Sequence, residues 1–175
     1  NDLVYMFLKG QPDAKVLDCG SGVVSILHGT VKNLTPCDLL GNEYAEFFDY
    51  KAHGIPSPFP SSCEDLKFKQ AFDIVHISNA FDHVQDPNKA FDAMYRAVKP
   101  GGFLIIQGFT NEGTHEDWHG MHQWNLYLKD GDLFVDSKSE HYFSIMGDFF
   151  STTIHLDMLD RDWFIFILRK EPLEV

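Results

Sequence analysis

The chain has 175 residues, of which 44% are hydrophobic and 14% aromatic, and its formal net charge at pH 7 is −12. This apolar content excludes a disordered chain, and the length suffices for one buried core, so we expect residues 1–175 to form a single domain. The negative charge, with lysines and arginines scattered rather than clustered, argues against a nucleic-acid partner.

The N-terminal region predicts a helix, a buried strand and a second helix. The first helix covers Asp2–Lys9, before the helix-ending residues Gly10 and Pro12. The apolar pair Val16-Leu17 predicts the strand. The second helix is expected over Val23–His28, where Gly29 ends it.

Two glycines, Gly20 and Gly22, follow the acidic end of this strand, Asp18. Glycine lets the backbone turn sharply where a side chain would collide with a ligand, as at the carboxyl end of the first strand of a nucleotide-binding α/β domain. We expect Asp18 to order this turn by accepting backbone N–H bonds. Ser25 stands where the dinucleotide fingerprint G-x-G-x-x-G has its third glycine, which disfavours a nicotinamide cofactor.

Asp38 belongs to the next predicted strand, Leu34–Leu40, which Pro36 weakens. It follows Gly20 by eighteen residues. In nucleotide-binding α/β folds, an acid about 20 residues beyond the glycines accepts hydrogen bonds from a ribose. The alternative role of Asp38 is an N-cap of a helix predicted over Glu43–Tyr50.

The middle of the chain predicts a weak edge strand, two buried strands and a helix. Three alternating prolines within residues 53–62 permit only an edge strand there. Phe72–Asn79 is the clearest central strand. Asp86-Pro87 begins a helix with an apolar face that extends to Val98, and Phe103–Gln107 is the next buried strand.

The C-terminal region predicts two strands, Thr152–Asp160 and Trp163–Arg169, joined by a tight turn at residues 160–162. We interpret them as an antiparallel hairpin that ends an otherwise parallel sheet.

Two parts of the sequence resemble the class I S-adenosylmethionine (SAM) methyltransferase family: residues 14–22, AKVLDCGSG, and FDIVHISNAFDHVQDP followed by VKPGGFLII, within residues 72–106. The resemblance covers about residues 15–107 by motif. It implies an α/β, doubly wound, Rossmann-like sheet of seven mostly parallel strands, with a C-terminal antiparallel hairpin and helices on both faces. It also implies SAM as the cofactor and a small molecule as the methyl acceptor.

The same resemblance implies a set of cofactor-binding residues. They are Asp18, Gly20 and Gly22 at the turn, Asp38 and Leu39 at the ribose, Cys63 and Glu64 at the adenine, and Ser78, Asn79 and His83 at the methionine end. Ser62 stands where the family commonly has an acid, and Glu64 or Asp65 is a candidate to compensate. The alternative for residues 61–66 is a plain helix N-terminus. The alternative for His83 is a hydrogen-bonded histidine in the wall of the crevice.

A segment rich in histidine and tryptophan, Gly113–Asn125, leaves the carboxyl end of the fifth strand. We predict that it forms the acceptor wall, with His119 or His122 as the catalytic base; the alternative is a plain surface loop. His115-Glu116-x-x-His119 also matches the zinc-protease motif. Because Gly113 and Gly120 leave room for a single turn, and no third ligand follows, we expect no metal site.

The three cysteines, Cys19, Cys37 and Cys63, form no CxxC pair and are odd in number, which predicts reduced thiols in a cytoplasmic protein. No apolar run is long enough to cross a bilayer, so we expect no membrane partner. The sequence begins at Asn1 rather than Met, which is compatible with a truncated N-terminal segment.

Three functions follow from these observations. The first is SAM-dependent methyl transfer to a small molecule. The second is a catalytically weak methyltransferase-like module that binds SAM or a partner, favoured by Ser62 and by the short N-terminal segment. The third, an NAD-dependent oxidoreductase, is disfavoured by Ser25 and by the terminal hairpin.

Overall fold

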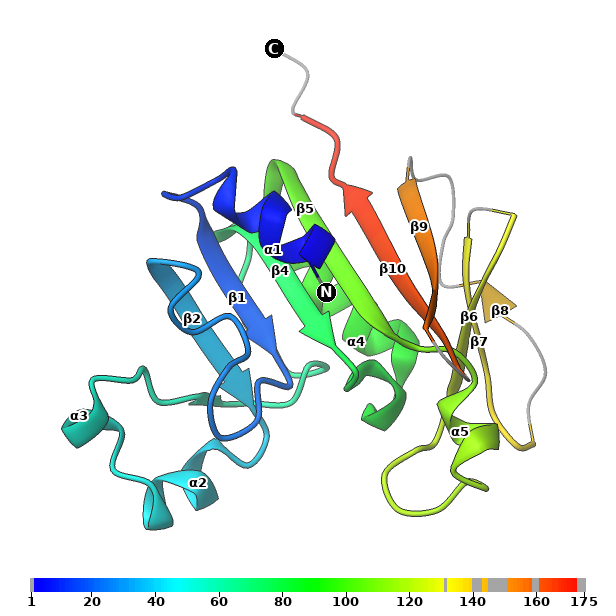
Figure 1. The fold of residues 1–175 in the computed structure, drawn as a ribbon, viewed down its shortest axis with the longest axis horizontal. Helices are drawn as coiled ribbons and strands as arrows, with labels where there is room; N and C mark the ends of the chain where they lie inside the picture. Colours follow the sequence, from blue (N-terminus) through cyan, green and yellow to red (C-terminus); the bar gives the residue numbers. More distant parts are fainter. Residues whose placement is uncertain (1, 131, 140–142, 145–150, 159–160, 173–175) are drawn as a thin grey trace.

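The fold is built on a seven-stranded sheet with the order β3-β2-β1-β4-β5-β10-β9 (Figure 1). The computed structural model describes residues 2–130, 132–139, 143–144, 151–158 and 161–172. The strands are β1 (Lys15–Cys19), β2 (Asn33–Asp38), β3 (Phe59–Pro60), β4 (Phe72–Ser78), β5 (Val98–Phe109), β9 (Ser151–Met158) and β10 (Arg161–Arg169).

Strands β1 to β5 pair in parallel, whereas β10 pairs antiparallel with both β5 and β9. This topology confirms the predicted fold class, including the terminal hairpin. The edge strand β3 has only two residues, Phe59 and Pro60, as expected where three alternating prolines cannot donate to a ladder. The turn predicted at residues 160–162 is wrong for Arg161 and Asp162, which belong to β10 and pair with Met158 and Asp157 of β9; Asp160 lies outside the described residues.

Helices cover both faces of this sheet. Helix α1 (Asp2–Lys9) lies in front of the sheet in Figure 1, and α4 (Pro87–Ala97) lies behind it. Val4 and Leu8 of α1 join one apolar core, and Phe91 and Met94 of α4 join the other. Asp86 caps α4 by accepting a hydrogen bond from the Lys89 amide, as predicted for this N-cap. Among the described residues, none of the helices has the length and apolarity needed to cross a bilayer.

Two predicted helices differ in the structure. The segment Val23–His28 forms bends and turns instead of a helix, because the Ser25 hydroxyl accepts from the Leu27 amide and donates to Asp18. Such local side-chain bonds compete with helical backbone bonds. The helix expected over Glu43–Tyr50 is divided into α2 (Gly41–Phe47) and α3 (Tyr50–His53).

A second, antiparallel sheet inserted between β5 and β9 was not expected from the sequence. It contains β6 (Asn125–Lys129), β7 (Asp132–Asp136) and β8 (Phe143–Ser144). Leu126, Leu133 and Val135 of this sheet are buried in the same core as α4 and β10. The insertion therefore extends the α4 side of the molecule and fixes the end of the segment after β5.

Candidate active site

A crevice opens at the carboxyl ends of β1 and β4, where open α/β sheets bind their ligands. It contains a cavity of about 180 Å³, lined by Asp18, Gly20, Ser21, Ile26, Ser78 and Asn79. Five of these six residues belong to the glycine turn and to the β4 end that the sequence selected as the cofactor site. The predicted residues Asp18, Gly20, Ser78 and Asn79 are thus brought together.

A larger hollow of about 380 Å³ lies at the opposite edge of the sheet, lined by Gln11, Pro12, Asp13, Ala14, Asp73, Pro100, Gly101, Gly102 and Phe103. These residues lie before β1, near the start of β4 and in the first half of β5. Its carboxylates include Asp73, which bonds to Lys99 and to the Lys15 amide. We therefore place the candidate site in the smaller crevice, where the glycine turn and polar side chains converge.

The glycine turn is fixed by its conformation and by contacts with β2. Gly20 has φ +61°, and a Cβ there would come within 2.6 Å of the Ala80 Cβ. Gly22 has φ +66°, and a Cβ added there would meet no described atom within 4 Å. The Gly22 amide donates to Asp38 Oδ2 (2.9 Å), and the Ser21 amide donates to the Cys37 carbonyl (3.1 Å). The turn is therefore held against the end of β2.

Asp18 is 2% exposed and has a role different from the expected one. Its Oδ1 lies 2.6 Å from His76 Nδ1, and its Oδ2 accepts from the Ser25 hydroxyl at 2.5 Å. His76 Nε2 lies 2.9 Å from Gln107 Nε2. The carboxylate thus joins a buried chain of side chains across β1, β4 and β5, rather than the backbone N–H groups of the turn.

Asp38 bridges the glycine turn and the residues after β2. Besides the bond from Gly22, its Oδ1 accepts from the Leu40 amide at 3.0 Å. Helix α2 has Leu40 as its N-cap and no side-chain cap, so the N-cap role considered for Asp38 is wrong. Burial and the nearby Asp38 carboxylate raise the pKa of Tyr44. Leu39 is 61% exposed beside this carboxylate.

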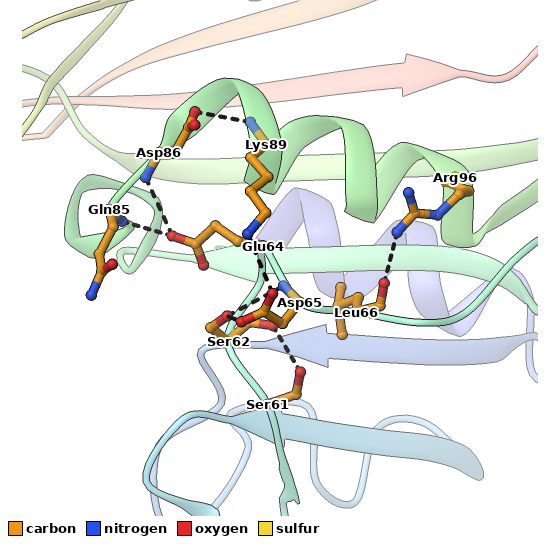
Figure 2. A network of polar contacts seen from close by, with 9 residues as sticks. All are labelled: Ser61, Ser62, Glu64, Asp65, Leu66, Gln85, Asp86, Lys89 and Arg96. Carbon is orange, nitrogen blue, oxygen red and sulfur yellow. Dashed lines mark hydrogen bonds and ion pairs between the residues drawn. The ribbon is translucent and has the colours of Figure 1, made fainter.

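Glu64, expected at the adenine, directs its side chain toward the start of α4 (Figure 2). Its Oε1 accepts from the amides of Gln85 (2.7 Å) and Asp86 (3.3 Å). Two backbone N–H groups of the loop before α4 are thereby satisfied. This carboxylate joins the candidate adenine segment to the loop before α4.

Asp65 and Ser62 form a second part of this network (Figure 2). The Ser62 hydroxyl donates to Asp65 Oδ2 at 3.2 Å, and Lys89 Nζ lies 3.3 Å from Asp65 Oδ1. The hydrogen bond from Lys89, followed by that from Ser62, lowers the pKa of Asp65. Residues 61–66 form no helix, so the helix N-terminus considered for them is wrong. Cys63 is buried in the α4-side core.

Asn79 closes the crevice at the end of β4. Its φ is +49°, a left-handed conformation in which asparagine is enriched among non-glycine residues. The Asn79 backbone N–H donates to the Gln107 backbone carbonyl at 2.8 Å, and the side-chain oxygen Oδ1 of Asn79 accepts from the Phe109 backbone N–H at 3.3 Å. These bonds hold the ends of β4 and β5 together next to the half-buried Ser78.

Two histidines and two carboxylates meet just beyond Asn79. The short helix η1 (Phe81–His83) supplies Asp82 and His83, and the segment after β5 supplies Glu112 and His122. His122 Nδ1 lies 2.6 Å from Asp82 Oδ2 and 3.6 Å from Glu112 Oε2. His83 Nε2 lies 3.4 Å both from Asp82 Oδ2 and from His122 Nδ1. We call Asp82, His83 and His122 the histidine–aspartate cluster.

The segment after β5 is held against η1 by hydrogen bonds. The Gln123 amide donates to the Asp82 carbonyl at 3.0 Å, and the Trp124 indole N–H donates to the Val84 carbonyl at 2.7 Å. The Trp118 ring lies against Gly113, where an added Cβ would come within 2.6 Å of it. The Trp118 ring therefore contacts the start of its own segment, and Trp124 is bonded to the residue that follows η1.

The two predicted catalytic histidines have different surroundings. The His119 side chain is 80% exposed, whereas that of His122 is 25% exposed and faces Asp82. Helix α5 (Glu112–His115) ends where the zinc-protease motif begins, so His115 and His119 do not share a helix. Sequence reasoning missed Asp82 and Glu112. The signal was their position directly after β4 and β5, whose carboxyl ends are neighbours in the sheet.

Comparison with known proteins identifies the family of this chain. The family model for the methyltransferase domain matches residues 17–106, from within β1 to within β5. The chain belongs to the methyltransferase domain family. The matched range contains the glycine turn, Asp38 and the η1 residues of the cluster, whereas His122 lies beyond it.

Two curated relatives match part of this methyltransferase domain. They are ubiquinone/menaquinone biosynthesis C-methyltransferases UbiE from Psychromonas ingrahamii and Haemophilus ducreyi, 31% and 33% identical over 86 residues. Each alignment covers 47% of this chain, and 34% and 33% of the respective relative. The aligned part therefore spans about a third of the length of the curated relatives it matches.

Solved methyltransferase structures share the fold at low sequence identity. Burkholderia thailandensis 1,6-didemethyltoxoflavin-N1-methyltransferase has a TM-score of 0.60 at 14% identity, over 97% of this chain and 77% of that one. Magnesium protoporphyrin IX methyltransferase from Synechocystis PCC 6803 has a TM-score of 0.59 at 14% identity, with the same two coverages. The first was solved with S-adenosylhomocysteine and the second with SAM.

Proposed function

We propose that this chain catalyses methyl transfer from SAM to a small-molecule acceptor in the crevice at the carboxyl ends of β1 and β4. The observation that carries the proposal is the glycine turn. Gly20 leaves space that a Cβ would fill, and Gly22 donates its amide to Asp38. This arrangement fits a nucleoside ligand, because a bare backbone allows close approach and a carboxylate at the second strand accepts ribose hydroxyls. The cofactors named for the two solved relatives support the choice of SAM.

Asp38 and Leu39 would hold the ribose, and Ser78 and Asn79 the methionine end. Each Asp38 oxygen already accepts one backbone N–H bond and retains capacity for another donor. At the adenine, the proposal uses the backbone of Cys63 and Glu64, because the Glu64 side chain bonds to the loop before α4. Bound SAM supplies an electrophilic methyl group. The protein must align it with the acceptor and exclude water.

The acceptor side is formed by the histidine–aspartate cluster. Because His122 Nδ1 lies 2.6 Å from Asp82 Oδ2, that nitrogen carries the ring proton and donates a hydrogen bond to the carboxylate. Nε2 is then the unprotonated nitrogen and takes the proton of an acceptor hydroxyl or amine. We therefore propose His122, rather than the exposed His119, as the general base. We assign His83 to the acceptor side rather than to the cofactor.

We also propose a cytoplasmic protein without a nucleic-acid partner. The support is the net charge of −12 and the three free cysteines, all buried.

The experiment is a calorimetric titration with SAM. We expect saturable SAM binding and no NAD binding. Asp38→Ala should weaken SAM binding about 10–150-fold, the equivalent of the roughly 1.5–3 kcal/mol of a hydrogen bond to a charged group. Asp13→Ala is the matched control, because Asp13 is 90% exposed at the opposite edge of the sheet. Equal SAM affinity in a folded Asp38→Ala variant would remove Asp38 from the site.

A binding module without methyl transfer is the second candidate. It is favoured by the adenine segment, where Glu64 and Asp65 are both engaged in bonds toward α4. A folded protein that does not bind SAM would contradict the enzyme and support the form of this candidate that binds a partner instead. NAD binding would instead support an oxidoreductase.

A further inference from the structure

We propose that the histidine–aspartate cluster binds one divalent transition-metal ion of the zinc type beside the crevice. Asp82, His83 and His122 each offer one ligand atom, and these atoms lie within 4.8 Å of one another. Two imidazoles and one carboxylate are a donor set that zinc and iron(II) bind in proteins, with positions left open for water or substrate.

The distances among the three donor atoms fit such an ion. Two separations are 3.4 Å, from His83 Nε2 to Asp82 Oδ2 and to His122 Nδ1. A tetrahedral zinc ion with bonds of about 2.0–2.1 Å separates its ligand atoms by about 3.3–3.4 Å. The third separation, His122 Nδ1 to Asp82 Oδ2, is 2.6 Å. Only this pair has to move apart, by less than about 1 Å, when an ion replaces the proton between them.

The charge and burial of the cluster favour a cation. Asp82 is 2% exposed, and a buried carboxylate requires a positive or hydrogen-bonding partner. Glu112, 4% exposed, brings a second carboxylate to within 3.6 Å of the same His122 nitrogen. A divalent ion would neutralise both carboxylates while the two histidines stay neutral.

The scaffold holds the ligands in place without an ion. Asp82 and His83 are neighbours on η1, and the bonds from Gln123 to the Asp82 carbonyl and from Trp124 to the Val84 carbonyl attach the segment that carries His122. This set differs from His115 and His119, which led us to expect no metal from the sequence. The ligands come from two segments 39 residues apart, a spacing that no short motif describes.

The consequence for catalysis rests on the proposed function, whereas the metal site itself does not. An open position on the ion would bind an oxygen of the acceptor, and a metal-bound hydroxyl loses its proton to water more readily than a free one. With the ion on Nδ1, the His122 ring proton moves to Nε2, so His122 is a ligand rather than the base. The base role of His122 then belongs to the metal-free protein.

The test is cobalt and zinc binding by the chelator-treated 175-residue chain, in the absence of SAM. Co²⁺ bound to histidines gives a visible absorption band, which Zn²⁺ should abolish by displacement and excess Mg²⁺ should not. We expect one Co²⁺ per chain. His83→Ala and His122→Ala should each weaken binding by more than the roughly 10–100-fold that loss of an outer-shell partner costs.

His119→Ala is the matched control, because it removes an 80% exposed histidine of the same segment and should leave Co²⁺ affinity unchanged. Circular dichroism establishes that each variant is folded, and glutamine at the same position replaces an alanine variant that is not, for example His83→Gln or His122→Gln. Absence of Co²⁺ and Zn²⁺ binding below millimolar concentration would overturn the metal site. So would equal binding by the folded His83 and His122 variants. A SAM titration of the same preparation reports separately on the proposed function.

Discussion

Alanine at Gly20 and at Gly22 should destabilise the protein to different extents, although both glycines belong to one turn. Both have positive φ, +61° and +66°. An L-residue in that conformation costs about 1–2 kcal/mol. At Gly22 this is the whole expected loss, because no described atom lies within 4 Å of an added Cβ.

Gly20→Ala adds a collision with Ala80. The added Cβ would stand 2.6 Å from the Ala80 Cβ, whereas carbon atoms pack best at about 3.5–4.0 Å. Ala80 has no further side-chain atoms to rotate away, so the backbone before η1 has to move. Overpacking of this kind costs about 1–3 kcal/mol, which gives a total loss of about 2–5 kcal/mol.

Urea unfolding followed by circular dichroism measures both variants. We expect the free energy of unfolding to fall further in Gly20→Ala than in Gly22→Ala, by about 1–3 kcal/mol. Equal losses in the two variants would show that the Gly20–Ala80 contact does not restrict the turn. A larger loss in Gly22→Ala would refute the reasoning entirely.

Three further predictions concern buried or paired groups. Burial would raise the pKa of Asp73, but hydrogen bonds from Lys99 and from the Lys15 amide lower it. At neutral pH, Asp73→Asn should therefore lower the free energy of unfolding, by less than about 1 kcal/mol because the pair is half-exposed. In urea titrations this difference between the variant and the original protein should vanish as the pH falls below about 4, where Asp73 becomes protonated. Lys170→Met should lower stability by about 1–3 kcal/mol in thermal unfolding, because Lys170 Nζ donates to the Tyr95 and Val98 carbonyls; an unchanged melting temperature would contradict this. Burial raises the pKa of Cys37 to about 12. A thiol reagent should therefore label Cys37 only as fast as the protein unfolds. Rapid labelling of Cys37 in the folded protein would contradict this prediction.

The fold was predictable where the sequence carries long periodic signals. Phe72–Asn79 and Phe103–Gln107 are continuous apolar runs, and strands buried on both faces have that pattern. The small β6–β8 sheet was missed, although Asp130-Gly131 between alternating apolar residues is a hairpin signal. The helix predicted over Val23–His28 was wrong because one hydroxyl, that of Ser25, bonds across the turn to Asp18. Periodicity contains no information about such a contact.

In the proposed site, the cofactor residues could be selected from the sequence, whereas the residues on the acceptor side could be selected only in part. Gly20 and Asp38 lie at characteristic sequence positions near the ends of predicted strands, so local spacing identifies them as candidates. His122 was predicted from the composition of its segment, but its partner Asp82 depends on how two segments meet in space. His119 looked equivalent in sequence and is exposed, since only the backbone path after α5 decides which histidine faces inward.

The buried chain Asp18–His76–Gln107 explains why an acid stands at the end of β1. Gln107 Nε2 donates a hydrogen bond to His76 Nε2, so the His76 ring proton lies on Nδ1. This N–H donates a hydrogen bond to Asp18. The other Asp18 oxygen accepts from Ser25, which holds the segment containing Ile26 at the cavity wall. Asp18 therefore connects three central strands to the loop that follows the glycine turn. Because Asp18 is 2% exposed as well as bonded at both oxygens, we propose that it shapes the crevice as a positioning residue rather than binding a ligand directly.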